Sequence, residues 1–127
     1  MVKNHRDLTV WQKAVDLVME VNHLITKLPR DEKFALADQL RRAASSIPSN
    51  IAEGRARSSD RDYLRFLYMA RGSLAEIDTQ LYIAVKMKYF TDSDVEFAIN
   101  LHTEVAKMLN KMISTLNNKI QLLKANS

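Results

Sequence analysis

The feature that most restricts the fold is an uninterrupted heptad pattern between residues 63 and 84. Seven apolar side chains recur there at alternating steps of four and three residues: Tyr63, Leu67, Ala70, Leu74, Ile77, Leu81 and Ala84. This spacing puts all seven on one face of an α-helix, as in the seam of a coiled coil. A helix of this length draws most of its stability from packing that face against other helices. The rest of the chain is therefore expected to supply further helices.

Helical periodicity extends over nearly the whole chain of 127 residues. It predicts four helices, at about residues 10–27, 32–56, 60–88 and 92–123. Good capping residues stand at the predicted starts, among them Asp31, Ser59 and Thr91. Two glycines and two prolines are too few for the turns of an all-β protein. We therefore expect one all-α domain over residues 1–127, an antiparallel up-down-up-down four-helix bundle with short connections.

Pro48 interrupts the second helical pattern, because proline removes one backbone hydrogen bond and clashes with the carbonyl four residues earlier. The apolar spacing continues past it, which predicts a single helix kinked at Pro48. Two helices separated at residues 45–49 are the alternative. In the third pattern, Gly72 costs about 1 kcal/mol relative to alanine. That cost is acceptable if a neighbouring backbone passes close by.

A polar notch is predicted at this kink, formed by Pro48, Asn50 and Gly54. Asn50 and Gly54 fall near the face that carries the apolar residues inward, where an amide must find hydrogen-bond partners. In one interpretation the Asn50 side chain only repairs the interrupted backbone ladder. In the other, the notch belongs to a functional site beside the arginines of the same helix.

All of the net charge of +4 comes from residues 41–71. Seven arginines and no lysine stand there against three acidic residues, whereas basic and acidic residues balance on either side. The planar arginine fork binds phosphate or carboxylate groups through two parallel hydrogen bonds and stacks on flat rings. The stretch suggests a recognition surface, and a solvated helix face is the plain alternative. The candidate binding residues are Arg41, Arg42, Arg55, Arg57, Arg61, Arg65 and Arg71.

Three of these arginines have a helical spacing of their own. Arg57, Arg61 and Arg65 fall four residues apart and form a ridge if the third helix begins early. Tyr68 would continue this ridge as a stacking surface. Basic residues interleaved with an exposed aromatic ring suit nucleic acid, but the same face could bind carboxylates of another subunit.

Catalytic and metal-binding patterns are poorly represented. A di-iron bundle needs a Glu-x-x-His motif on each of two helices, and Glu20 with His23 is a single match. His102 falls on an apolar face, where a packed or interfacial histidine is expected. No ordered nucleophilic triad can be argued, and Gly54 and Gly72 do not make a phosphate-binding loop. We expect no enzymatic activity, no metal and no cofactor.

Composition also restricts the compartment. The absence of cysteine fits a reducing environment. Residues 1–7 are polar and do not begin a signal peptide. No apolar run approaches the length of a membrane span. The sequence therefore predicts a cytoplasmic protein without a membrane partner.

More positions are apolar than one inner face of a bundle requires. The surplus in the third and fourth patterns comprises Leu64, Phe66, Met69, Phe97, Leu101, Met108 and Ile113. Such residues either widen the core or form surface patches that a monomer does not leave in water. Trp11, Tyr89 and Phe90 are candidate aromatic anchors at a contact between copies. These positions predict a closed homo-oligomer.

Three runs give the chain a family resemblance: LTVWQKA at 8–14, QLRRAASSIPSNIAEG at 39–54 and ARGSLAE at 70–76. With these runs, nearly the whole chain resembles the four-helix bundle family named for proteins encoded in bacterial 23S rRNA intervening sequences. The resemblance implies a bundle kinked in its second helix that assembles into a ring-like homopentamer. The family also includes accessory proteins of diversity-generating retroelements, which bind nucleic acid and a reverse transcriptase.

Two functional hypotheses follow. The first is a non-enzymatic, nucleic-acid-associated homo-oligomer that binds through the seven arginines. RNA is the first candidate ligand and DNA is the second. The alternative is a structural oligomer. In this alternative, the arginines pair with carboxylates of neighbouring subunits or of a partner protein. The family resemblance suggests a reverse transcriptase as that partner.

Overall fold

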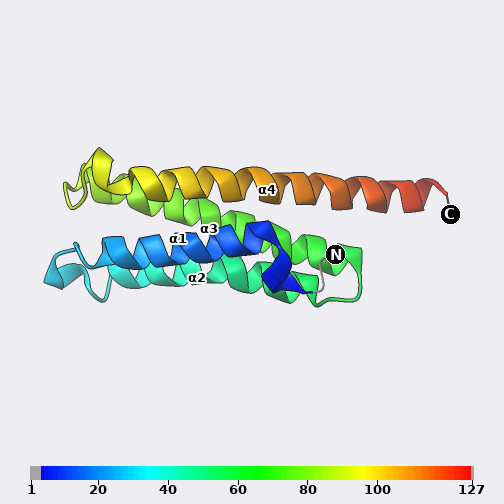
Figure 1. Ribbon diagram of the computed structural model, residues 1–127, viewed down its shortest axis with the longest axis horizontal. Helices are drawn as coiled ribbons and strands as arrows, with labels where there is room; N and C mark the ends of the chain where they lie inside the picture. The colour runs from blue at the N-terminus through cyan, green and yellow to red at the C-terminus, as the bar shows by residue number, and fades with distance from the viewer. Residues whose placement is uncertain (1–3, 127) are drawn as a thin grey trace.

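The computed structural model describes residues 4–126; residues 1–3 and 127, which the predicted domain includes, lie outside the described part. Within it, all regular structure is helical and no strand occurs. The long helices are α1 (Thr9–Ile25), α2 (Leu36–Arg55), α3 (Asp60–Lys86) and α4 (Asp92–Ala125). Short 3₁₀ turns η1 (His5–Asp7) and η2 (Arg30–Glu32) precede α1 and α2. Figure 1 shows the chain reversing direction at each connection between long helices.

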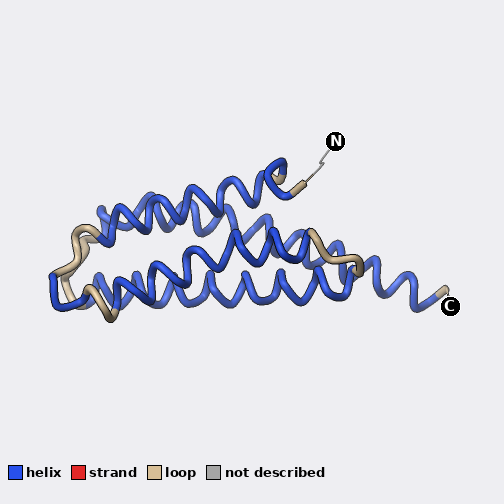
Figure 2. The backbone as a smooth tube through the Cα atoms, turned by 90° about the horizontal axis from the view of Figure 1, so that it is seen from below, coloured by secondary structure: helices blue, strands red, loops and turns tan. Residues whose placement is uncertain are grey.

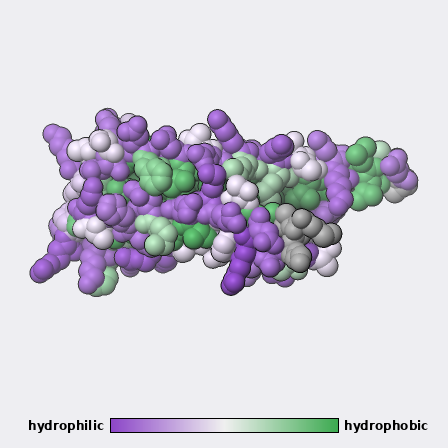
Figure 3. Space-filling view, viewed as in Figure 1, coloured by the Kyte–Doolittle hydropathy of each residue, from purple (hydrophilic) through white to green (hydrophobic). Residues whose placement is uncertain are grey.

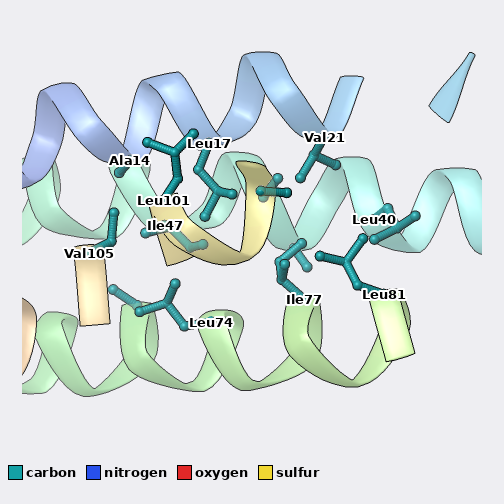
Figure 4. Packing of buried hydrophobic residues seen from close by; sticks show 14 of the residues in the cluster. Ala14, Leu17, Val21, Leu40, Ile47, Leu74, Ile77, Leu81, Leu101 and Val105 are labelled. Atoms are coloured by element: carbon teal, nitrogen blue, oxygen red, sulfur yellow. The ribbon is translucent and has the colours of Figure 1, made fainter. Parts of the chain in front are cut away.

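The core is a single apolar cluster along the bundle axis. Both α1 and α3 contact α2 and α4, so the helices follow one another around the bundle in chain order. Leu17, Ile47 and Leu74, from three different helices, point toward one another in Figure 4, and Leu17 and Ile47 are fully buried. Of the seven seam positions in α3, six are buried and Tyr63 is half-buried. The heptad pattern therefore faces the core.

The predicted start of the second helix, at residue 32, is wrong. Pro29 is followed by the η2 turn, and α2 begins only at Leu36. Asp31 thus lies in the turn, while the N-cap of α2 is Ala35, which provides no side-chain cap. Phe34 is 82% exposed, so the buried face of this segment starts two residues later.

Around Pro48 the helix is continuous. α2 includes Pro48 and runs to Arg55 without a break, which excludes two helices separated at residues 45–49. Pro48 itself is buried. The kink expected there stays a prediction.

Some of the surplus apolar side chains widen the core, and others remain on the surface. Phe66, Leu101 and Ile113 are buried, whereas Met69 and Phe97 are exposed. The predicted anchor Phe90 is wrong: it is only 2% exposed, because it packs in the chain's own core beneath the α3–α4 turn. Trp11 and Tyr89 are half-buried against the same core.

α4 is the longest helix, and its C-terminal end projects past the other three, as Figure 2 shows. Leu122 and Leu123 on this end are more than three-fifths exposed. Figure 3 shows separate apolar patches among hydrophilic side chains, one of them toward this end. Within residues 4–126, no helix combines the length and the apolar character needed to cross a membrane.

Candidate nucleic-acid interface

All seven candidate arginines are exposed, but they do not form one patch. Four of them, Arg55, Arg57, Arg61 and Arg65, gather where the C-terminal end of α2 turns into α3. Arg41 and Arg42 lie in the first half of α2, about 20 Å away at about 1.5 Å per residue. Arg71 lies farther along α3 and contacts α4. The arginines therefore divide into three groups.

The group at the α2–α3 turn is built on Phe66. The guanidinium carbons of Arg57 and Arg65 lie 4.8 Å and 4.6 Å from the centre of this ring. Phe66 is itself only 5% exposed and so forms a fixed support. Cation–π contacts of this kind hold guanidinium groups in place while they remain charged. We call Arg55, Arg57, Arg61, Arg65 and Phe66 the turn cluster.

The predicted ridge of Arg57, Arg61 and Arg65 on one helix is wrong. α2 ends at Arg55 and α3 begins at Asp60, so Arg57 lies in the turn between them. Ser59 caps α3 by accepting a hydrogen bond from the Asp62 backbone, which fixes the later start. The ring of Phe66, rather than helical spacing, brings Arg57 and Arg65 together.

Two arginines of the turn cluster also contact carboxylates. Arg57 lies 3.4 Å from a Glu53 carboxylate oxygen, and Arg65 lies 3.6 Å from one of Asp62. All four side chains are about half exposed, so these pairs are weak. Contacts this weak leave the arginine forks available to a stronger anion such as phosphate.

Arg71 and Tyr68 form a separate unit between α3 and α4. The Arg71 guanidinium lies 4.9 Å from the centre of the Tyr68 ring and donates to Asn110 Oδ1 at 3.2 Å. The Tyr68 hydroxyl accepts a hydrogen bond from Asn117 at 3.0 Å. Arg71 thus already occupies the ring that sequence reasoning offered to a base for stacking.

The structure does not bring the residues of the predicted polar notch together into one site. Gly54 is buried where α2 crosses α3, and a Cβ atom added to it would lie 2.8 Å from Tyr63 Cδ1 and 2.9 Å from Phe66 Cβ. Gly54 therefore permits close helix packing and lines no polar site. Burial raises the pKa of the Tyr63 hydroxyl, and the charge of Arg55 opposes that rise.

Asn50 makes a local hydrogen bond. It is half-buried and donates from Nδ2 to the Ser46 carbonyl at 2.8 Å. The Ser49 hydroxyl likewise donates to the Ser45 carbonyl at 2.8 Å. Both contacts stay within α2, and neither reaches the Ala44 carbonyl that Pro48 leaves without its helical donor.

The remaining candidates for chemistry lie apart from the arginines. His102 is half-buried, and its Nε2 lies 2.7 Å from the Leu74 carbonyl, as expected of a packed histidine with one satisfied nitrogen. In the described part of the chain no three His, Asp or Glu side chains gather as metal ligands would. His23 is exposed on α1.

Sequence reasoning missed a polar groove between α2 and α3, of about 310 Å³. We call it the α2–α3 groove. It is lined by Gln39, Arg42, Ala43, Ser46, Ser73, Glu76 and Gln80. One feature of the sequence could have indicated this groove. Ser73 and Gln80 each stand directly before a residue of the heptad seam, and both are buried in the structure.

Comparison with known proteins identifies the family. The family model of the 23S rRNA-intervening sequence protein matches residues 6–111. The chain belongs to this family. The match covers the arginines and the α2–α3 groove, and it ends before the projecting part of α4.

A solved member of the S23 ribosomal protein family has a similar structure. This protein of unknown function from Bacteroides thetaiotaomicron superposes with a TM-score of 0.77 at 26% sequence identity. The alignment covers 83% of the present chain and 98% of the other. No curated protein matches the chain.

Proposed function

We propose that this chain is a non-enzymatic, nucleic-acid-binding protein that acts as a homo-oligomer, with RNA as the first candidate ligand and DNA as the second. The observation that carries the proposal is the turn cluster, where Arg57 and Arg65 are both held on the Phe66 ring. Arginines positioned in advance lose less freedom when they grip a phosphate. RNA is the first ligand to test because the family takes its description from 23S rRNA intervening sequences.

Oligomerisation is part of the proposal. A closed ring repeats the turn cluster on every subunit and converts weak phosphate contacts into avid binding. The family resemblance suggests five copies. The exposed apolar side chains, among them Tyr82 and Phe97, support a contact between copies. A protein with this function is expected in the cytoplasm.

A structural oligomer is the second candidate. It is favoured by the carboxylates that Arg41, Arg57 and Arg65 already contact, because the same forks could pair with acidic residues of a neighbour. The acidic residues could also belong to a partner protein such as a reverse transcriptase. On this alternative, nucleic acid is not bound.

A salt titration separates the two candidates. We expect affinity for a labelled single-stranded RNA to fall with salt, with a log–log slope of about −0.7 for each phosphate contacted. Arg61→Gln should make this slope less steep by about 0.7, the value of one lost phosphate contact. Lys86→Gln makes the same charge change at the last residue of α3, far from the α2–α3 turn, and should leave the slope unchanged. Absence of binding at low salt, or a flat salt response, contradicts the proposal and favours the structural oligomer.

A further inference from the structure

The α2–α3 groove contains polar groups that the chain itself leaves unsatisfied. Gln80 is only 8% exposed, and its Oε1 is buried without a hydrogen-bond partner among the described residues. Its Nε2 reaches Gln39 Oε1 only at 3.5 Å. A buried acceptor without a donor costs free energy, so such groups point to a missing partner.

Two opposite charges complete the lining. Arg42 from α2 and Glu76 from α3 both border the groove. Within residues 4–126, neither the Arg42 guanidinium nor the Glu76 carboxylate has an ion-pair or hydrogen-bond partner. On the floor, the hydroxyls of Ser46 and Ser73 bond to each other. The groove thus offers a two-pronged donor and a two-pronged acceptor above a buried amide.

We propose that the α2–α3 groove binds one unpaired guanine of single-stranded RNA. Guanine is the base that presents two adjacent donors, N1–H and the N2 amino group, beside the acceptors O6 and N7. A carboxylate accepts from the first pair, and an arginine fork donates to the second. In RNA, such readout targets bases splayed out of the helix. This inference rests on the proposed function of RNA binding.

The character of the groove favours a base over a second copy of the chain. Contacts between copies bury apolar centres, whereas this lining is charged and polar. The exposed apolar side chains Tyr82, Phe97 and Ile99 do not line it. Arg41 is the neighbour of Arg42, is half exposed and lies 3.0 Å from an Asp38 carboxylate oxygen. It is therefore placed to meet a flanking phosphate.

The groove also joins two of the runs on which the family resemblance rests. Gln39, Arg42 and Ser46 come from residues 39–54, and Ser73 and Glu76 come from residues 70–76. The turn cluster instead lies entirely between these runs. The two surfaces thus have different roles, since the turn cluster binds phosphates without sequence preference and the groove selects a base.

The test uses ten-nucleotide uridine RNAs that carry one central guanosine, adenosine or inosine, with binding to the full chain followed by fluorescence anisotropy. We expect the guanosine RNA to bind about tenfold tighter than all-uridine RNA. Inosine, which lacks the N2 amino group, should fall between them. Glu76→Gln and Arg42→Lys should each remove most of this preference. Asp78→Asn makes the same charge change as Glu76→Gln on α3, outside the groove, and should retain the preference.

The outcomes separate the two proposals. Salt-dependent binding with equal affinity for all three bases overturns the guanine site and leaves RNA binding standing. An undiminished preference in Glu76→Gln also overturns the site. A change in oligomeric mass in that variant assigns the groove to a contact between copies and overturns it as well. No binding to any of the RNAs overturns the proposed function, and the guanine site with it.

Discussion

At the scale of single residues, the two glycines have opposite surroundings although both lie inside long helices. Gly54 faces Tyr63 and Phe66 so closely that a Cβ atom has no room. A Cβ atom at Gly72 would meet nothing within 4 Å. No neighbouring helix therefore passes close enough to Gly72 to account for the cost of glycine there.

This difference gives a matched pair of substitutions. Gly54→Ala should lower the free energy of unfolding by about 1–3 kcal/mol, because the methyl group forces α2 and α3 apart. Gly72→Ala should raise it by about 0.5–1 kcal/mol, because alanine is the better helix former. Urea unfolding monitored by circular dichroism measures both changes. Equal effects of the two substitutions would mean that the tight crossing at Gly54 does not exist in solution.

Sequence reasoning could place these glycines on helices but could not see what lies opposite them. The pattern along α2 puts Gly54 in the polar notch because it shares a face with Asn50. The same face meets Tyr63 and Phe66 of α3, and that depends on how two helices cross. Periodicity within one helix contains no information on the crossing. For the same reason it could not foresee that Phe66 holds Arg57 and Arg65 together.

At the scale of elements, helix starts are predicted well where a side chain caps the helix. Ser59 accepts from Asp62 at the start of α3, and Thr91 with Asp94 forms a capping box at the start of α4. α2 has no side-chain cap, and its predicted start is wrong. Asp31 does not act as a cap, because it lies inside the η2 turn, whose N-cap is Pro29 without a side-chain hydrogen bond.

Asp94 links the start of α4 to α1 and makes stability depend on pH. Its carboxylate accepts from the Thr91 backbone at 2.9 Å and from Lys27 Nζ at 3.0 Å. The Thr91 hydrogen bond, with a smaller contribution from Lys27, lowers the pKa of Asp94 below its usual 3.8. A carboxyl group with a lowered folded pKa stabilises the fold above the unfolded value and loses this effect as pH falls through the folded one.

We therefore expect Asp94→Asn to lower the midpoint of thermal unfolding at pH 7 and to have a smaller effect near pH 3. Thermal melts of both proteins from pH 7 to pH 3 measure this gap, which is the difference between the two unfolding midpoints. Asp92→Asn removes the same charge from the same turn, outside the capping box, and should show a smaller gap at pH 7. A gap for Asp94→Asn that stays constant across this range would contradict the role of its charge.

At the scale of the whole molecule, the remaining question is what covers the exposed apolar side chains. Large hydrophobic residues stay exposed on α1, in the α1–α2 connection, and along α3, α4 and the turn between them: Met19, Phe34, Tyr68, Met69, Tyr82, Ile83, Met87, Phe97, Ile99, Leu122 and Leu123. The sequence indicated a surplus of apolar positions, but only the folded chain separates those that widen the core from those left outside. The predicted anchor Phe90 belongs to the core.

Light scattering at micromolar concentration tests the assembly. We expect a mass that is a multiple of 14.6 kDa, and for five copies about 73 kDa, which is five times 14.6 kDa. If apolar contacts join the copies, the mass should persist in 1 M salt, whereas contacts between arginines and carboxylates should weaken there. A mass near 14.6 kDa at all concentrations contradicts the oligomer and removes the avidity of repeated arginine clusters.

The projecting end of α4 has a practical consequence for labelling. The start of the described chain lies at the end of the bundle where α2 turns into α3, close to the arginines of the turn cluster (Figure 1). An affinity tag or fluorophore attached there would crowd the surface that RNA is proposed to use. The far end of α4 extends beyond that turn (Figure 2). Lys119 on that part of α4 lies 3.2 Å from Asp60, and Leu123 and Lys124 line a hollow together with Arg61, so a tag there would crowd the same surface. A label in the α1–α2 or α3–α4 connection, at the opposite end of the bundle, would leave the arginines facing the solution.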